Sequence, residues 1–447
     1  MPGREPTVGP EQGGDPRERA VLVGLAPSHA QFEAAEASLD ELAMLADTAG
    51  AEAVERVIQV RETPDTATYL GKGKAREVVE LAQALHADAI IFDDELAPAQ
   101  GRNLEDLAGV NPLAPNQIKI IDRTGLILDV FSQHAQSAEG KLQVELAQLN
   151  YHIPRLRGWS DVMSRLGGGI GTRGPGETKL EVDRRRIRKR LTKLRGDLAD
   201  VERTRDLKRK SRARSQVPQI SLVGYTNSGK STLLNALTGA GVLVEDRLFS
   251  TLDPTARRLD LPDGRHAVLT DTVGFVKKLP HTLVEAFRST LEETGLSDLL
   301  LHVVDASQPD PEAQMDAVAR VLGEIGASQI PTILAFNKRD LISDADAEVL
   351  GARHPGAVFI SAARGDGLED LLALLGERVA AARLVVDFEV PFDRGDVRSH
   401  LHEEGDVLEE TFESGGYRLQ VRTSQDVLTR FSEFLVNGRP SPDGDGA

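Results

Sequence analysis

Short apolar runs alternate with helical patterns through the N-terminal part of the chain. Four such runs have the length and the Val/Ile content of buried strands. They cover residues 21–25, 57–60, 89–92 and 118–121, and helical patterns cover 32–49, 74–86 and 98–108. This alternation is typical of a mostly parallel sheet. We therefore predict a small N-terminal α/β domain at 20–130, preceded by a Gly/Pro-rich, disordered N-terminus at 1–19.

The pattern changes to a heptad spacing in the next segment. Apolar residues step by 3, 4 or 7 on both sides of a glycine-rich loop at 166–177. The two seams are Leu142, Leu146, Leu149, Ile153, Leu156 and Leu180, Ile187, Leu191, Leu194, Leu198, Val201. Two helices with such narrow seams, joined by a loop, are expected to pack as an antiparallel coiled coil. We predict this helical hairpin over residues 131–215.

Beyond residue 216 the apolar runs again have the length of strands. Runs at 219–223, 267–269, 333–336 and 357–360 each lead directly into a polar or glycine-containing loop. They predict a doubly wound sheet over 216–382. Strands at 385–390 and 417–422 and a helix near 396–403 predict a small C-terminal α+β domain at 383–437, followed by a disordered tail at 438–447. The predicted fold class is multidomain α/β.

The loop after the strand at 219–223 is a phosphate-binding motif. Its residues are Gly224-Tyr225-Thr226-Asn227-Ser228-Gly229-Lys230-Ser231, a complete match to G-x-x-x-x-G-K-[ST]. A helical pattern at 232–237 follows, so the backbone N–H groups of the loop are expected to face phosphates at the positive end of a helix. Lys230 is expected to contact the β- and γ-phosphates, and the Ser231 hydroxyl is expected to ligate Mg²⁺.

A second motif indicates the base of the nucleotide. Asn337-Lys338-Arg339-Asp340 follows the strand at 333–336, and the Asp340 carboxylate can accept hydrogen bonds from N1 and N2 of guanine. Adenine has no such pair of donors, so ATP would leave that carboxylate unpaired. Ser361-Ala362-Ala363 is expected to complete the pocket with a backbone N–H directed at O6 of guanine. Together the motifs predict a GTPase.

Two further loops are expected to sense the γ-phosphate. In Asp271-Thr272-Val273-Gly274, the carboxylate of Asp271 is expected to hold Mg²⁺ through water, and the N–H of Gly274 to bond the γ-phosphate. The other loop contains Phe249-Ser250-Thr251-Leu252-Asp253, with Thr251 as the expected second Mg²⁺ hydroxyl and Thr255 as its alternative. The residues assigned catalytic roles are Lys230, Thr251, Gly274 and Asn227.

Phe275 follows Gly274, at the position where many small GTPases have a water-orienting glutamine. A phenylalanine side chain cannot hydrogen-bond a water, so we expect slow hydrolysis that something else completes. Asn227 has two interpretations. Its place in G-x-x-N-x-G-K-S resembles P-loops that use a K⁺ ion near the phosphates; alternatively it only caps the loop through side-chain–backbone bonds. The sequence leaves both open.

Charge is strongly segregated along the chain. The net charge is −17, yet residues 184–214 contain fifteen Lys and Arg against four acids, a local +11. Because solvated faces usually mix signs, this helix is predicted to bind a polyanion. The candidate RNA-binding residues are Arg165, Arg173, Arg184, Arg185, Arg186, Arg188, Lys189 and Arg190.

A second glycine-rich turn, Tyr69-Leu70-Gly71-Lys72-Gly73-Lys74, precedes a predicted helix. It is either an anion site at a helix N-terminus or simply a basic helix entry, and a second nucleotide site stays open. The chain has no cysteine, no apolar run of 18 residues and no signal peptide. We expect a soluble, monomeric protein of the cytoplasm, without a membrane span.

The motifs together resemble the HflX family of translation-associated GTPases. The resemblance is carried by residues 169–181, 224–231, 251–255 and 271–275, and it covers nearly all of the chain after residue 20. The segment Gly-Ile-Gly-Thr-Arg-Gly-Pro-Gly-Glu-Thr-Lys-Leu-Glu at 169–181, joined to this GTPase domain, makes the resemblance specific.

The resemblance implies a factor that binds the large ribosomal subunit in its GTP state and helps split stalled ribosomes. It also implies that the helical hairpin and its glycine loop reach into ribosomal RNA, and that the ribosome stimulates hydrolysis, in keeping with Phe275. The alternative is a regulatory GTPase switch that docks on a protein partner without RNA, through the coiled coil and the C-terminal domain. The acidic ends of the chain leave any additional partner open.

Overall fold

The computed structural model describes most of the chain in several stretches. They are residues 17–110, 117–155, 179–213, 217–239, 248–249, 255–278, 294–381, 384–413, 415–423 and 425–436. The glycine-rich loop with Arg165 and Arg173 therefore lies outside the described residues, as do Ser250, Thr251, Leu252 and Asp253. The chain divides into two compact units: Met1–Ala135, Gln143–Leu194 and Lys278–Leu283 form the first, and the remaining residues form the second.

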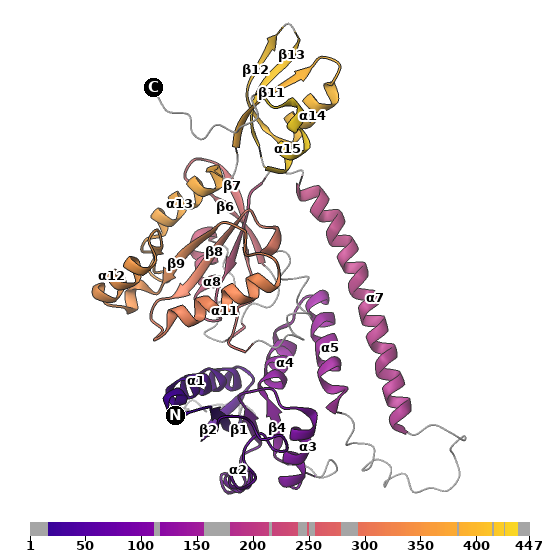
Figure 1. Cartoon of the computed structure of the whole chain (residues 1–447), viewed down its shortest axis with the longest axis vertical. Coiled ribbons are helices and arrows are strands. Elements are labelled where there is room, and N and C mark those ends of the chain that lie inside the picture. Colours follow the sequence, from indigo (N-terminus) through magenta and orange to yellow (C-terminus); the bar gives the residue numbers. More distant parts are fainter. Residues whose placement is uncertain are drawn as a thin grey trace, which may run out of the picture. The chain divides into compact units, whose positions relative to one another are not determined.

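The first unit is built on a four-stranded parallel sheet with the order β2-β1-β3-β4. Its strands are β1 (Glu18–Ala26), β2 (Ala51–Val60), β3 (Ala89–Phe92) and β4 (Lys119–Asp122), and its helices include α1 (Phe32–Thr48), α2 (Lys72–Ala84) and α3 (Pro98–Leu107). These elements confirm the predicted strands and helices (Figure 1). Helix α4 (Arg123–His134) was not predicted, and it continues past residue 130, where we placed the end of the domain.

Apolar side chains at helical spacing hold the helices against this sheet. Val21, Val23, Ile90 and Phe92 of the strands form one buried cluster with Ala75, Val78, Val79 and Ala82 of α2 and Leu104 of α3. Helix α1 buries Leu39, Leu42 and Leu45 completely. A spacing of three residues places these leucines on one stripe of the helix, as an amphipathic helix on a sheet requires.

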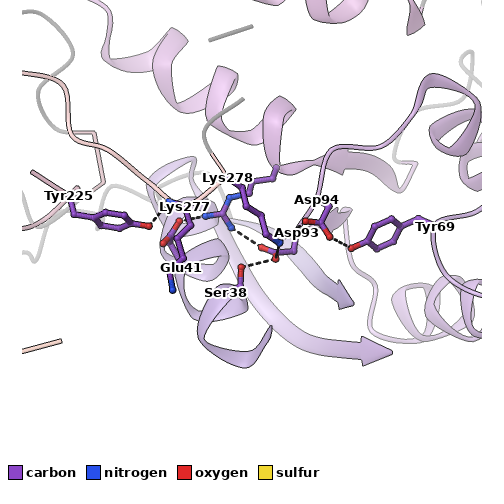
Figure 2. Close-up of polar contacts among 9 residues, drawn as sticks. Ser38, Glu41, Tyr69, Asp93, Asp94, Tyr225, Lys277 and Lys278 are labelled. Atoms are coloured by element: carbon purple, nitrogen blue, oxygen red, sulfur yellow. Dashed lines mark hydrogen bonds and ion pairs between the residues drawn. The ribbon is translucent and has the colours of Figure 1, made fainter. Parts of the chain in front are cut away.

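A buried charge cluster lies where β3 ends (Figure 2). The guanidinium of Arg123 is 2 % exposed, and it forms ion pairs with Glu41 and with Asp93, the latter at 2.7 Å. Asp93 also accepts a hydrogen bond from Ser38 Oγ at 2.7 Å. Lys278, which belongs to the same compact unit, lies 2.5 Å from Asp93 Oδ2 and pairs with Asp94 as well. Two cations thus neutralise carboxylates that would be costly to bury alone.

The second unit contains a six-stranded sheet with the order β10-β9-β8-β5-β7-β6. The strands are β5 (Gln219–Val223), β6 (Thr255–Asp260), β7 (His266–Asp271), β8 (Leu299–Asp305), β9 (Thr332–Asn337) and β10 (Val358–Phe359). Only β6 runs antiparallel to its neighbour. This is the predicted doubly wound sheet, with strand order reversing around β5.

Helices cover both faces of the six-stranded sheet. On one face, α8 (Lys230–Thr238) and α13 (Leu368–Ala381) contribute Leu233, Leu234, Leu371 and Leu375 to a core with the strands. On the other, α11 (Pro311–Glu324) and α12 (Asp344–Arg353) pack Met315 and Leu350 near Phe336. The sheet is therefore buried between two helical layers, as its nearly continuous apolar strands require.

Two helices form where the hairpin was predicted, namely α5 (Ala138–His152) and α7 (Lys179–Ala213). The burial of α5 does not follow the heptad seam. Val144 and Ala147 are buried, whereas Leu142, Leu146 and Leu149 are only half-buried. In α7, Leu191 and Leu194 are buried. The coiled coil is thus not supported and stays a prediction.

A small antiparallel sheet precedes the C-terminus. Its strands β11 (Leu384–Pro391), β12 (Asp406–Glu413) and β13 (Gly416–Thr423) have the order β11-β13-β12. Helices α14 (Gly395–Glu404) and α15 (Gln425–Arg430) pack on it through Val397, Leu401 and Leu428. The α+β prediction is confirmed, although β12 was not predicted.

Candidate functional site

The P-loop lies where the strand order of the large sheet reverses. It follows β5, which has β7 on one side and β8 on the other, so its residues sit at the carboxyl edge of the sheet. Helix α8 begins at Lys230, directly after Gly229 in the left-handed conformation with φ of +92°. A Cβ at Gly229 would lie 2.2 Å from Asn337 Nδ2, so only glycine permits this close approach. The local fold thus brings the phosphate loop against the base loop.

Lys230 is buried beneath the P-loop. Its ammonium donates to the carbonyl oxygens of Gly224, at 3.0 Å, and Tyr225, at 2.8 Å. Burial lowers the pKa of Lys230 to about 8, although the nearby Asp271 carboxylate opposes that shift. Burial, with help from Lys230, also lowers the pKa of His302 in β8 to about 4, so His302 is neutral near pH 7. Burial therefore makes the Lys230 ammonium a weaker base than an exposed lysine.

Ser231 and Asp271 form the second part of the phosphate site. Ser231 Oγ donates to Asp271 Oδ2 at 2.6 Å, and both residues are buried. A hydroxyl and a carboxylate so close together, beside a phosphate loop, are the oxygen donors that Mg²⁺ prefers. These two residues therefore fit a magnesium ion. Thr255 begins β6 and is half-buried, whereas Thr251, the preferred hydroxyl, lies outside the described residues.

Phe275 is paired with the P-loop through its backbone. Its N–H donates to Gly224 O at 3.2 Å, and its carbonyl accepts from Thr226 N at 2.7 Å. The side chain of Phe275 is 2 % exposed. Two residues on, the N–H of Lys277 donates to the hydroxyl of Tyr225 (Figure 2). The chain after Gly274 therefore runs beside the P-loop like an adjoining strand, and the phenyl ring is directed into the protein rather than toward water.

Gly274 itself approaches the P-loop closely. A Cβ there would lie 2.9 Å from Thr226 Cα and 3.1 Å from Lys230 Nζ. Any larger residue would force the segment away from the lysine. The predicted hydrogen bond from the Gly274 N–H to the γ-phosphate stays a prediction.

The base loop is joined to the P-loop by one amide side chain. Asn337 Nδ2 donates to Ser228 O at 2.8 Å, and Asn337 Oδ1 accepts from Ala362 N at 2.9 Å. The structure thereby brings the loop around Ser228 together with the loops around Asn337 and Ala362, which follow it by more than a hundred residues in the sequence. The short β10 ends just before Ser361, so the third loop also starts at the carboxyl edge of the sheet.

Asp340 lies beside Ser361 and Arg364. A hydrogen bond from the Ser361 side chain lowers the pKa of the Asp340 carboxyl, and the positive charge of Arg364 acts in the same direction. Arg364 Nε is 3.3 Å from Asp340 Oδ2, and the arginine side chain is 63 % exposed. Asp340, whose side chain is 14 % exposed, is thus an anionic acceptor in the base loop. Arg364 was not predicted, because a surface arginine after Ala363 carries no motif.

Sequence reasoning also missed Asp305, the last residue of β8. Its carboxylate lies 2.8 Å from Lys338 Nζ in the base loop, and its side chain is 4 % exposed. One signal was present: a single acid closes a strand, Leu299–Asp305, that is apolar except for His302. The partner could not be found, since Lys338 lies in the loop after the neighbouring strand β9.

Helix α7 presents several of the candidate RNA-binding side chains to solvent. Arg185, Arg186, Arg188 and Lys189 are exposed. Arg190 instead forms a bidentate ion pair with Glu145 of α5, at 2.6 and 2.5 Å. The Arg184 side chain lies outside the described residues. Arg190 is exposed as well, its side chain by 43 %, so its charge is shared with Glu145 at the surface of the protein.

The Gly-Lys-Gly-Lys turn in the first unit makes protein contacts typical of a helix entry. The N–H of Gly71 donates to Gln59 Oε1 at 2.9 Å, and Lys74 Nζ pairs with Glu77 at 2.6 Å. Two groups of the turn, the Gly71 N–H and the Lys74 ammonium, thus have partners in the protein. This favours the simpler interpretation of the turn.

Comparison with known proteins gives consistent matches along the chain. A family model described as "50S ribosome-binding GTPase" matches residues 219–338. Models described as "GTP-binding GTPase N-terminal" and "GTP-binding GTPase Middle Region" match 36–132 and 134–212. Together they cover more than half of the chain.

Curated relatives extend over nearly the whole length. GTPase HflX of Caldanaerobacter subterraneus subsp. tengcongensis is 46% identical over 421 residues, 94% of each chain. GTPase HflX of Escherichia coli is 44% identical over 414 residues, 91% of this chain and 94% of the relative. A GTP-binding protein from Sulfolobus solfataricus, solved with GDP, is 23% identical, with a TM-score of 0.42 over 81% of this chain and 99% of the other. On the curated relatives and the three family models, the chain belongs to the HflX family of GTPases.

Proposed function

We propose that this GTPase binds the large ribosomal subunit in its GTP state, with the basic face of α7 on ribosomal RNA, and helps split stalled ribosomes. The observation that carries the proposal is the exposed cationic face, which includes Arg188 and Lys189, in a chain of net charge −17. The match to a family described as a 50S ribosome-binding GTPase supports the choice of partner. A ribosomal partner also implies a location in the cytoplasm.

In the proposed nucleotide site, each loop binds one part of GTP. The P-loop N–H groups and Lys230 bind the β- and γ-phosphates. The Asp340 carboxylate accepts from N1 and N2 of guanine, and the N–H of Ala362 or Ala363 donates to O6. Asn337 holds the base loop against Ser228, as its hydrogen bonds support. The lowered pKa of Asp340 keeps that carboxylate charged for this purpose.

The Ser231 hydroxyl would hold Mg²⁺, and the Asp271 carboxylate would hold it through water. When bound, the ion neutralises charge on the phosphate oxygens. Thr251 is the proposed second hydroxyl ligand, with Thr255 as the alternative. Gly274 is the proposed γ-phosphate contact, because its small size allows the chain to pass beside Lys230.

Hydrolysis is proposed to be slow until the ribosome is bound. Phe275 is buried and its backbone is paired with the P-loop, so neither its ring nor its peptide group is available to orient the attacking water. Asn227 is exposed, with φ of +59°, a conformation that asparagine tolerates better than most residues. Its backbone geometry thus accounts for Asn227 locally, and a K⁺ ion beside it is a separate proposal. Equal hydrolysis rates in K⁺ and Na⁺ would remove that ion.

Cosedimentation with purified large subunits tests the ribosomal partner. We expect binding with a nonhydrolysable GTP analogue, weaker binding with GDP, and a steep loss between about 50 and 200 mM salt. The double variant Arg188→Ala/Lys189→Ala is expected to reduce the slope of log affinity against log salt by up to about 2. Arg76→Ala/Arg320→Ala removes two exposed cations from α2 and α11 and is expected to leave the slope unchanged.

Two results would overturn the proposal. One is no cosedimentation at low salt with the GTP analogue. The other is a complex that survives nuclease treatment and is insensitive to both double variants, which would favour a switch that docks on a protein partner. Subunit dissociation of 70S ribosomes, followed by light scattering, then tests the splitting step.

A further inference from the structure

The carboxylate of Asp305, the last residue of β8, is held by several hydrogen bonds. The N–H and the hydroxyl of Ser307 donate to Asp305 Oδ1 at 3.0 and 2.6 Å. The amide of Gln308 donates to Oδ2 at 3.2 Å. The turn after β8 therefore fixes the carboxylate from one side, and Oδ2 lies 2.8 Å from Lys338 Nζ on the other.

Lys338 has a backbone conformation that requires support. Its φ of +61° and ψ of +35° are left-handed, which costs about 1 kcal/mol or more for a residue other than glycine. This turn lets the residues on either side point in different directions. Asn337 reaches Ser228 of the P-loop, while Asp340 lies next to Ser361 and Arg364. Lys338 therefore lies in the chain between Asn337, which contacts the P-loop, and Asp340.

The two strand ends are locked in register beside this pair. Asp305 stands opposite Asn337 in the parallel pairing of β8 with β9, and Ala306 N donates to Asn337 O at 3.0 Å. The Asp305 side chain is 4 % exposed and that of Lys338 is 26 % exposed. The Lys338 ammonium is thus held at a buried carboxylate, and its aliphatic stem joins the left-handed turn to the end of β8.

We propose that Asp305 is a positioning residue for guanine-nucleotide binding. By holding the Lys338 ammonium, it fixes the aliphatic stem of Lys338 as one wall of the base site between the P-loop and Asp340. The inference rests on the proposed base site and adds to it a residue from the neighbouring strand. It concerns the base end of the ligand and leaves the phosphate end unaffected.

The test compares a ligand with a base and one without. In full-length protein, Asp305→Asn keeps the size of the side chain and removes its charge. We expect GDP affinity, measured with a fluorescent GDP, to fall about tenfold, because a free Lys338 no longer preorganises the wall. Affinity for inorganic pyrophosphate, measured by competition, is expected to change less than twofold. A general distortion of the site would weaken both ligands.

A double-variant cycle assigns the effect to the pair. Lys338→Met is expected to weaken GDP binding as well, and adding Asp305→Asn to it should cost no more than a further twofold. Ser307→Ala removes the 2.6 Å hydrogen bond to the same carboxylate but keeps the ion pair, and GDP affinity should stay within about threefold. If Asp305→Asn does not fold, Lys338→Gln interrupts the same pair from its exposed side, with the same tenfold expectation for GDP and none for pyrophosphate.

Equal losses for GDP and pyrophosphate, or additive losses in the cycle, would overturn the inference. Its failure is distinguishable from that of the base site, because Asp340→Ala reports on the base site alone. If Asp340→Ala leaves GDP affinity unchanged, the proposed base site is wrong, and so is the proposal that the Lys338 stem forms one of its walls. If Asp340→Ala weakens GDP and Asp305→Asn does not, only the assignment of Asp305 is wrong.

Discussion

The four-stranded sheet and the mostly parallel six-stranded sheet both place carboxylates at the carboxyl ends of their strands, and these carboxylates have different partners. In the N-terminal sheet, Asp93 follows β3 and is neutralised by Arg123 and Lys278. Asp122, which ends β4, accepts hydrogen bonds from the N–H groups of Leu96 and Gly125 at 3.0 and 2.8 Å, and from other groups besides. These acids hold neighbouring segments of the first compact unit together.

The acids of the six-stranded sheet instead support loops that we propose to bind the nucleotide. Asp271 ends β7 and accepts from Ser231 of the P-loop, while Asp305 ends β8 and holds Lys338 of the base loop. The architecture alone therefore does not decide whether a strand-end carboxylate stabilises the fold or serves a ligand. What decides is whether the partner is a structural cation, such as Arg123, or a residue of a binding loop.

The largest expected effect tests the stabilising role of the strand-end carboxylates in the N-terminal sheet. Arg123→Met removes the guanidinium from two buried carboxylates, so the free energy of unfolding of the N-terminal sheet should fall by about 3–5 kcal/mol. GDP affinity should stay within twofold. Hydrogen exchange of the β1 and β3 amides measures the first and fluorescent GDP the second. Arg56→Met, which interrupts a surface pair with Asp40, should cost less than about 1 kcal/mol. A loss of GDP affinity in Arg123→Met would show that the two sheets are not used differently.

The next largest effect tests the proposed binding of guanine by the base loop. Asp340→Ala removes two charge-assisted hydrogen bonds to guanine, about 3 kcal/mol in all, so GDP affinity should fall about 100-fold. Binding of ADP should not change, and neither should the stability of the N-terminal sheet. The matched control is Asp316→Ala, an exposed acid on α11. Calorimetric titration with GDP and ADP measures the result, and ADP binding as tight as GDP in the unmodified protein would contradict it.

The pH dependence of binding sharpens the comparison further. Lys230 has a pKa lowered to about 8, and phosphate requires its charged form, so binding above pH 8 must take up a proton. GDP affinity should therefore fall about tenfold between pH 7 and pH 9. Burying that charge destabilises the folded chain below pH 8, and the destabilisation is relieved as the pH rises from 8 toward 10.5. Lys230→Arg, which stays charged, should bind GDP with a flat profile over the same range; a flat profile in the unmodified protein would contradict the shift.

The smallest expected effect concerns the N-terminal glycine turn. Lys72→Ala/Lys74→Ala should leave GDP affinity within twofold and the stoichiometry at one nucleotide per chain, because Lys74 is already paired with Glu77. Equilibrium dialysis with GTP and with ATP measures the stoichiometry. A second equivalent of either nucleotide that disappears in this variant would give the N-terminal sheet a ligand site of its own.

The spacing of apolar residues was sufficient to predict most of the helices and strands. The strands at 21–25 and 89–92 and the strand before each GTPase motif were predictable because buried parallel strands are nearly continuous apolar runs. Strand β12, Asp406–Glu413, was not, since Glu409, Glu410 and Glu413 interrupt its apolar pattern. Helix α4 was missed because Arg123, a charged residue at its first position, is buried by a tertiary ion pair.

The residues of the candidate site likewise fall into those that the sequence predicts and those that it does not. Motif residues such as Lys230 and Asp340 were predictable because phosphate and guanine require those groups at fixed spacing. Asp305 and Arg364 were not, because each acts through a residue on a different loop, and no spacing in the sequence encodes that contact. The coiled-coil seam shows the reverse case: a regular spacing of leucines at 142, 146 and 149 does not determine which face of a helix is buried.

The side-chain amide of Asn337 joins the loops that we propose to bind the phosphates and the base. Guanosine and pyrophosphate added as separate fragments would each have to order these joined loops alone, whereas the intact nucleotide orders them once. The association constant of the nucleotide should therefore exceed the product of the association constants of the two fragments, and replacing Asn337 should abolish this excess before it abolishes binding of either fragment.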